Sequence, residues 1–166
     1  MSPVEAVDAD RLLRTSLELD AIDSPTGHEQ EIGAHHETTF ADLGCATTRD
    51  DVGNLVAVFP GTGDRTILVA TRMDAAGTDH GVVLDTAAAI RSVGLEVVPR
   101  TSGGGTDGNL LDARGIPCVA LPAGMVDEHA TGEHIAVADL VTACRVLVAI
   151  VTQHGDRTTD REGAPA

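Results

Sequence analysis

The sequence predicts an α/β domain of the compact three-layer type with a partly parallel sheet. Two observations predict this fold class. Segments with helical and with strand-like hydrophobic patterns alternate along the chain, which is typical of a sheet covered by helices. The chain also has 166 residues of which 42% are hydrophobic, enough for one hydrophobic core and too many for a disordered chain.

The N-terminal third is predicted to hold two helices and the first strands. Apolar residues at helical spacing indicate a helix over residues 5–20, and a Ser-Pro-Thr-Gly turn separates it from a second helix over about 28–43. Glu29 and Glu31 fall in the first turn of this second helix, where the helix dipole favours acidic residues. Two strands follow, and the Pro-Gly-containing segment between them predicts a hairpin connection. The expected strands are residues 54–59 and 65–70, joined by 60–64.

The C-terminal half predicts alternating helices and strands that end in a polar tail. Gly94 is expected to stop the first of these helices, and Thr106 is a good N-cap for the short one. The expected helices are 83–93, 107–113 and 137–153, and the expected strands are 95–98 and 117–121. We therefore expect one domain over residues 1–154 and a flexible tail over residues 155–166.

Composition excludes several classes of protein. The formal net charge of −15 disfavours nucleic acid and anionic membranes, since both bind cationic surfaces. All 11 basic residues are Arg, a bias that either a saline habitat or a GC-rich genome would produce. No apolar run approaches the roughly 18 residues of a membrane span, and the N-terminus does not resemble a signal peptide. Together with three widely spaced cysteines, read as buried thiols in a reducing compartment, this predicts a cytoplasmic protein.

Two segments are candidate sites, each with a purely structural alternative. Gly103, Gly104 and Gly105 precede the short predicted helix and could hold an anion with backbone N–H groups, or could form a tight connection. Residues 125–134 contain two His and three acids, which could bind a divalent metal or lie in solvent. Three His near the second helix (His28, His35 and His36) and the pair Asp50-Asp51 are expected to be solvated.

The order of the motifs resembles a known family. The run IDSPTGHEQE, then DDVGNLVAVFPGTGD, then RMD is similar to the start of the dinuclear zinc peptidase family that contains tripeptide aminopeptidase, carboxypeptidase G and acetylornithine deacetylase. The segment GLEVVPRTSGGGTDGNLLDARGIPCVALPAGMVDEHATGEHIAVADL resembles the closing part of the same family. The resemblance covers about residues 10–153 and is nearest to the tripeptide aminopeptidase branch.

This resemblance implies a metallo-hydrolase of peptide or amide bonds, reduced in length and without the lid or dimerisation domain. His129 matches the last metal ligand, and Asp74 matches the Asp that orients the first ligand His. Residues 103–109 match the substrate-side loop, which implies a peptide-like small-molecule substrate and the binding residues Gly103, Gly104, Gly105, Thr106, Asp107 and Asn109. Zinc is the implied cofactor.

The departures from the family pattern change the expected function. Arg72 stands where the family has the first His of its His-x-Asp motif, and a guanidinium has no lone pair to donate to a metal. The stretch from Ala75 to Val82 is too short to hold the metal-bridging Asp, the catalytic Glu and its neighbouring ligand. We therefore expect a degenerate peptidase homologue with weak or no activity.

Two alternatives remain open. One is a non-catalytic binding or assembly subunit that pairs with itself or with a full-length homologue, so that an oligomer or partner chain covers an exposed sheet edge. The other is a small hydrolase with a rebuilt one-metal site, in which His80, Asp79 and Asp127 join His129.

Overall fold

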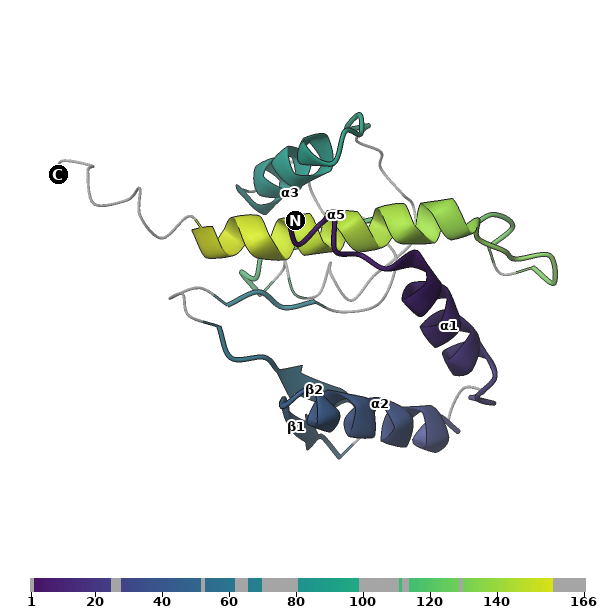
Figure 1. Cartoon of the computed structure of the whole chain (residues 1–166). Helices are drawn as coiled ribbons and strands as arrows, with labels where there is room; N and C mark the ends of the chain where they lie inside the picture. Colours follow the sequence, from purple (N-terminus) through teal and green to yellow (C-terminus); the bar gives the residue numbers. More distant parts are fainter. Residues whose placement is uncertain are drawn as a thin grey trace, which may run out of the picture. The chain divides into compact units, whose positions relative to one another are not determined.

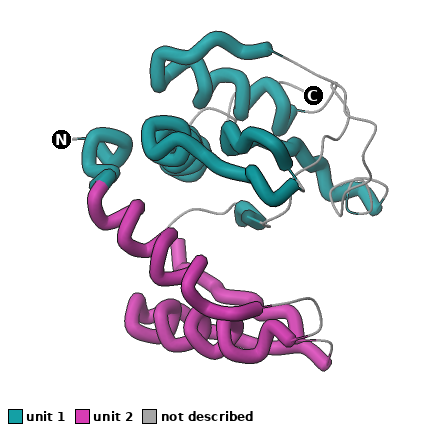
Figure 2. Tube along the Cα trace, turned by 90° about the vertical axis from the view of Figure 1, so that its right-hand side faces the viewer, with its two compact units in different colours: residues 1–9, 63–166 teal, residues 10–62 magenta. Residues whose placement is uncertain are grey.

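The computed structural model describes residues 2–24, 28–51, 53–61, 66–69, 81–98, 111, 114–128 and 130–156, with side chains to residue 153. Within these ranges the chain forms two compact units, coloured separately in Figure 2. Residues 10–62 form one unit, and residues 1–9 together with 63–166 form the other. The mixture of helices with a small sheet is consistent with the predicted α/β class. The predicted single domain over 1–154 and the tail from 155 stay predictions.

The unit of residues 10–62 contains a helix packed on a β-hairpin. Helix α1 (Ala9–Asp20) leads into it, and α2 (Gln30–Asp42) contacts both β1 (Ala46–Arg49) and β2 (Leu55–Val58), as Figure 1 shows. The strands pair antiparallel in a register that places Ala46 opposite Val58 and Arg49 opposite Leu55. The predicted helices 5–20 and 28–43 are thus confirmed in their central parts, and so is the predicted strand 54–59.

The predicted pairing partner of that strand was wrong. Sequence reasoning paired it with residues 65–70 across a hairpin at 60–64, but Thr66–Val69 carries no strand and β2 pairs with β1 instead. The turn between them is built by Asp50: its carboxylate accepts hydrogen bonds from the backbone N–H and the side-chain amide of Asn54, both at 2.8 Å. Gly53 in this turn has φ of 95°, a conformation that glycine adopts without a steric cost. These two side-chain bonds stabilise the turn that joins β1 to β2.

The other unit has its core between α3 (Gly81–Ser92) and α5 (Val137–Asp156), which contact each other. Small and β-branched residues let the two helices approach closely. The buried residues are Thr86, Ala87 and Ala89 on α3 with Val141, Val146 and Ala149 on α5. At one end Gln153 donates a 2.9 Å hydrogen bond to the Ser92 hydroxyl. As predicted, Gly94 ends α3: its φ is 83°, and the N–H of Leu95 bonds to the carbonyl of Ile90.

Two further predicted strands of this unit are wrong, because residues 95–98 and 117–121 carry no strand. Within the described ranges the only sheet is the two-stranded antiparallel one, so the expected parallel pairing does not occur there. Of the predicted helix 107–113 the structure describes only Leu111, which is helical. None of the described helices is long and apolar enough to cross a membrane.

Candidate functional site

The part of the predicted site that the structure describes is a loop closed by Val126 and His134. Their backbones form an isolated antiparallel bridge, with Val126 N–H to His134 O at 2.9 Å and His134 N–H to Val126 O at 3.1 Å. Two turns lie inside it, since the N–H of Ala130 bonds to Asp127 O and the N–H of Glu133 bonds to Ala130 O. The backbone of this loop is therefore held by its own hydrogen bonds.

Asp127 has a structural role in this loop that sequence reasoning did not assign to it. Its φ of 57° is the left-handed conformation, which Asp tolerates better than most residues. Its side chain is exposed and turns toward Gly132, because a Cβ built at Gly132 would lie 3.6 Å from Asp127 Oδ2. The residue proposed as a metal ligand from sequence thus also makes the tight turn into the loop.

His134 is a site residue that the sequence analysis did not single out. Its ring nitrogen Nδ1 lies 2.7 Å from the carbonyl oxygen of Gly132. A carbonyl oxygen only accepts hydrogen bonds, so Nδ1 carries a proton and, in the neutral ring, Nε2 keeps its lone pair. The sequence shows that His134 lies two residues after Gly132, but the hydrogen bond depends on the turn that brings the ring to the carbonyl, and this turn cannot be inferred from the spacing.

Most predicted site residues lie outside the described residues. These are the metal candidates Asp74, His80 and His129 with Asp79, and the substrate-side residues Gly103, Gly104, Gly105, Thr106, Asp107 and Asn109. Their assignments stay predictions. Of the residues named for the site, the structure places Asp127 alone.

The described residues do not by themselves provide the two-zinc site that the resemblance implies, and the implied ligand His129 lies outside them. A zinc site takes at least three protein ligands of the His, Cys, Asp or Glu type. No group of three or more such residues comes together within the described ranges. In the loop itself, Asp127 makes the turn and Nδ1 of His134 is bonded to a carbonyl. We therefore derive no catalytic step through a metal.

The three cysteines match their expected chemistry. Cys45, Cys118 and Cys144 are all free thiols, with Cys45 buried and the other two half-buried. Free Cys behaves in a protein interior as a small hydrophobic residue.

The expectation that the His residues near α2 are solvated is wrong for two of them. His35 and His36 are half-buried, and the His36 ring stacks on Phe40 at a centroid separation of 6.0 Å and an interplanar angle of 19°. Burial, followed by the neighbouring His35 ring, lowers the pKa of His36 below its ordinary value. His28 and the pair Asp50-Asp51 are exposed as predicted.

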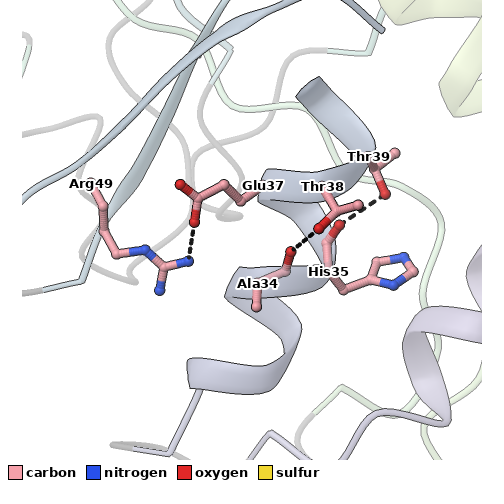
Figure 3. A network of polar contacts seen from close by, with 6 residues as sticks. All are labelled: Ala34, His35, Glu37, Thr38, Thr39 and Arg49. Atoms are coloured by element: carbon pink, nitrogen blue, oxygen red, sulfur yellow. Dashed lines mark hydrogen bonds and ion pairs between the residues drawn. The ribbon is translucent and has the colours of Figure 1, made fainter. Parts of the chain in front are cut away.

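Polar contacts on the same helix fix its neighbouring strand, as Figure 3 shows. Arg49 of β1 forms a 3.0 Å ion pair with Glu37 of α2. The guanidinium lies over Gly33, where a Cβ would come within 2.9 Å of a guanidinium nitrogen. The hydroxyls of Thr38 and Thr39 donate hydrogen bonds to the carbonyl oxygens of Ala34 and His35 within the same helix.

Comparison with protein families assigns the chain to a class of hydrolases. The chain belongs to Peptidase family M20/M25/M40, whose profile matches residues 11–153. This family is the one that the motif order resembled, and its members are typically metal-dependent. No curated protein and no solved structure matches the chain.

Proposed function

We propose that the protein is a degenerate, tripeptide-aminopeptidase-like member of this family, which binds peptide-like small molecules and hydrolyses them weakly or not at all. The single observation that carries the proposal is Arg72-Met73-Asp74 in place of the family's His-x-Asp motif. A guanidinium stays protonated at every physiological pH, so it cannot donate a lone pair and repels a divalent cation.

The shortness of residues 75–82 supports the same proposal. Two-metal hydrolysis needs two cations roughly 3.5–4 Å apart and a carboxylate that activates the water between them. The eight residues between Asp74 and Val83 contain one acid, Asp79, and one His, His80. This inventory is too small to replace the bridging Asp, the catalytic Glu and its neighbouring ligand. We propose that the segment carrying them has been lost from the chain.

The substrate side is the part of the family site that we propose is retained. Residues 103–109 keep the glycine-rich pattern, whose backbone N–H groups suit a carboxylate or a peptide carbonyl. The loop from Val126 to His134, which follows these residues in the family pattern, is closed by internal backbone hydrogen bonds. Three free thiols further support a cytoplasmic location.

The proposal is tested by separating binding from turnover. A panel of di- and tripeptides is incubated with the protein after dialysis against zinc, manganese or cobalt, and binding is measured in parallel by calorimetry. We expect peptide binding that weakens in Asn109→Ala but not in the exposed control His28→Ala, with product formation that is weak or no faster than in buffer and does not depend on added metal. Metal-dependent turnover that is lost in His129→Ala would instead establish the rebuilt one-metal hydrolase.

One observation favours a second function, a binding or assembly subunit. The face of the hairpin turned toward α2 carries Arg49, which bonds Glu37, so the alternate residues of β2 lie on the opposite face. These are Val56 and Val58, which are 49% and 57% exposed. Exposed apolar pairs on a sheet face are typical of a contact surface.

Molar mass in solution separates the two functions. An assembly subunit would elute as a dimer or larger species by size exclusion with light scattering, and Val58→Glu would convert it to a monomer. The matched control is His28→Glu, which adds the same charge at an exposed position outside this face. A monomer that still binds peptide would leave the first proposal standing alone.

A further inference from the structure

The unit of residues 10–62 gathers the aromatic side chains of the whole protein. The chain has two Phe and neither Tyr nor Trp. Phe40, on α2, meets Phe59, directly after β2, edge to face with ring centroids 6.0 Å apart and planes at 87°. Edge-to-face geometry is a favourable arrangement of two aromatic rings. This pair therefore connects the helix to the end of the hairpin.

His36 extends this pair into a cluster of three rings. Since His36 and Phe40 are four residues apart on α2, their rings lie one above the other on one helix face. The stacked ring of His36 covers the side of Phe40 and is itself half-buried. His35 stands edge-on at 6.0 Å and adds a second imidazole beside the first. The His36 ring packs on Phe40 in a half-buried position, where the charged form of an imidazole is less well hydrated than in water.

We propose that His36, Phe40 and Phe59 form a pH-sensitive clamp, which fastens α2 to the hairpin near neutral pH and loosens it in mildly acidic solution. A protonated His36 would carry its charge in a half-buried position, against the apolar ring of Phe40 and beside the ring of His35. The clamp thus goes beyond the binding function proposed above and does not depend on it.

Within the described residues, no acidic side chain contacts His36 to compensate a positive charge on its ring. Two strands pack against α2. Strand β1 contributes Arg49, a fixed cation already paired with Glu37 of α2, and β2 contributes no ionisable residue. On α2 itself, the ring in contact with His36 besides Phe40 is His35. Protonation of His36 therefore adds a charge to this cluster that none of these groups neutralises.

The sign of the pH dependence follows from the lowered pKa of His36. Above the ordinary His pKa both folded and unfolded chains hold a neutral ring, and the clamp is complete. As the pH falls below that value, the unfolded or opened form binds more protons than the closed form, so closure weakens. Carboxyl groups ordinarily titrate near pH 4, so the range from pH 7.5 to 5.5 reports on imidazoles.

Hydrogen exchange of the full-length protein tests the clamp. Backbone protection is compared at pH 7.5 and 5.5, after correction for the intrinsic exchange rate at each pH. We expect α2 and β2 to lose protection at pH 5.5 while α3 and α5 keep theirs. In His36→Phe, which keeps a stacked ring without a titratable group, this loss should vanish. In the matched control His35→Gln the loss should persist.

Two results would overturn the clamp. One is unchanged protection of α2 in the wild-type protein between the two pH values. The other is an equal loss of protection in His36→Phe, which would place the titrating group elsewhere in the unit. If His36→Phe is poorly folded, the ring signals of His36 in an NMR titration give an independent measurement, and a midpoint at or above the ordinary His pKa contradicts the proposal.

Discussion

Truncating Val146 should destabilise the α3–α5 unit far more than truncating Val151 on the same helix. Val146 is 7% exposed and belongs to the α3–α5 core, whereas Val151 is 48% exposed. Both changes, Val146→Ala and Val151→Ala, remove the same two methyl groups and raise the helix propensity by the same amount. The difference between them therefore isolates burial.

The magnitude follows from that burial. Losing two buried methyl groups costs about 1.6 kcal/mol in transfer free energy. The cavity left between the helices adds roughly 1 kcal/mol. The better helix propensity of Ala returns about 0.5 kcal/mol. Val146→Ala should thus lower the free energy of unfolding by about 2 kcal/mol, while Val151→Ala, with about half the transfer term and no cavity, should lower it by about 0.3 kcal/mol.

Urea denaturation followed by helical circular dichroism measures both values. If the free energy of unfolding falls with urea at the same slope in all three proteins, the urea midpoint of Val146→Ala should lie well below that of the wild type. The urea midpoint of Val151→Ala should stay close to the wild-type value. If the two variants lose equal stability, or if Val146→Ala costs less than about 0.5 kcal/mol, the packing of α5 on α3 described above is wrong.

Three further changes probe the hairpin and its contact with α2. Gly53→Ala should cost about 1 kcal/mol, because φ of 95° is strained for any residue with a Cβ, and a thermal melt showing no change would contradict this. Asp50→Ala removes both side-chain bonds to Asn54 and should increase exchange of the β1–β2 amides, whereas Asp50→Asn, which keeps one acceptor oxygen, should increase it less. Glu37→Gln should cost less than about 1 kcal/mol at low salt and nothing in 1 M salt, since the ion pair with Arg49 is exposed; a salt-independent loss would refute this.

The elements that sequence predicted are those specified by their own residues. The helical spacing of apolar residues located α1, α2, α3 and α5. The glycine at position 94 fixed the end of α3, and the apolar run before Phe59 located β2. Each of these signals depends only on neighbouring residues, so it can be interpreted without knowing the rest of the fold.

The elements that sequence reasoning missed depend on pairing. Strand β1 reads Ala-Thr-Thr-Arg, with no apolar alternation, and becomes a strand because the Asp50–Asn54 turn folds it onto β2. Residues 95–98 and 117–121 have the composition of strands but no strand structure. A strand needs a hydrogen-bonded neighbour, and composition alone does not supply one.

The conformation of the loop from Val126 to His134 could not be predicted from the sequence, and its predicted metal-binding chemistry stays a prediction. The residue types of the loop from Val126 to His134 indicated a polar site. Its closure depends on the left-handed backbone of Asp127 and on the bond from His134 to Gly132. Neither follows from residue type, because both require the two ends of the loop to meet.

We propose that this peptidase-family chain lacks the two-metal centre of its family. The most direct measurement is zinc stoichiometry by elemental mass spectrometry, after purification without chelator and equilibration with zinc. We expect fewer than two zinc equivalents per chain, with any bound equivalent lost in His129→Ala and retained in His28→Ala. Two tightly bound equivalents in the wild-type protein would contradict this proposal, because they would require a second set of ligands despite Arg72.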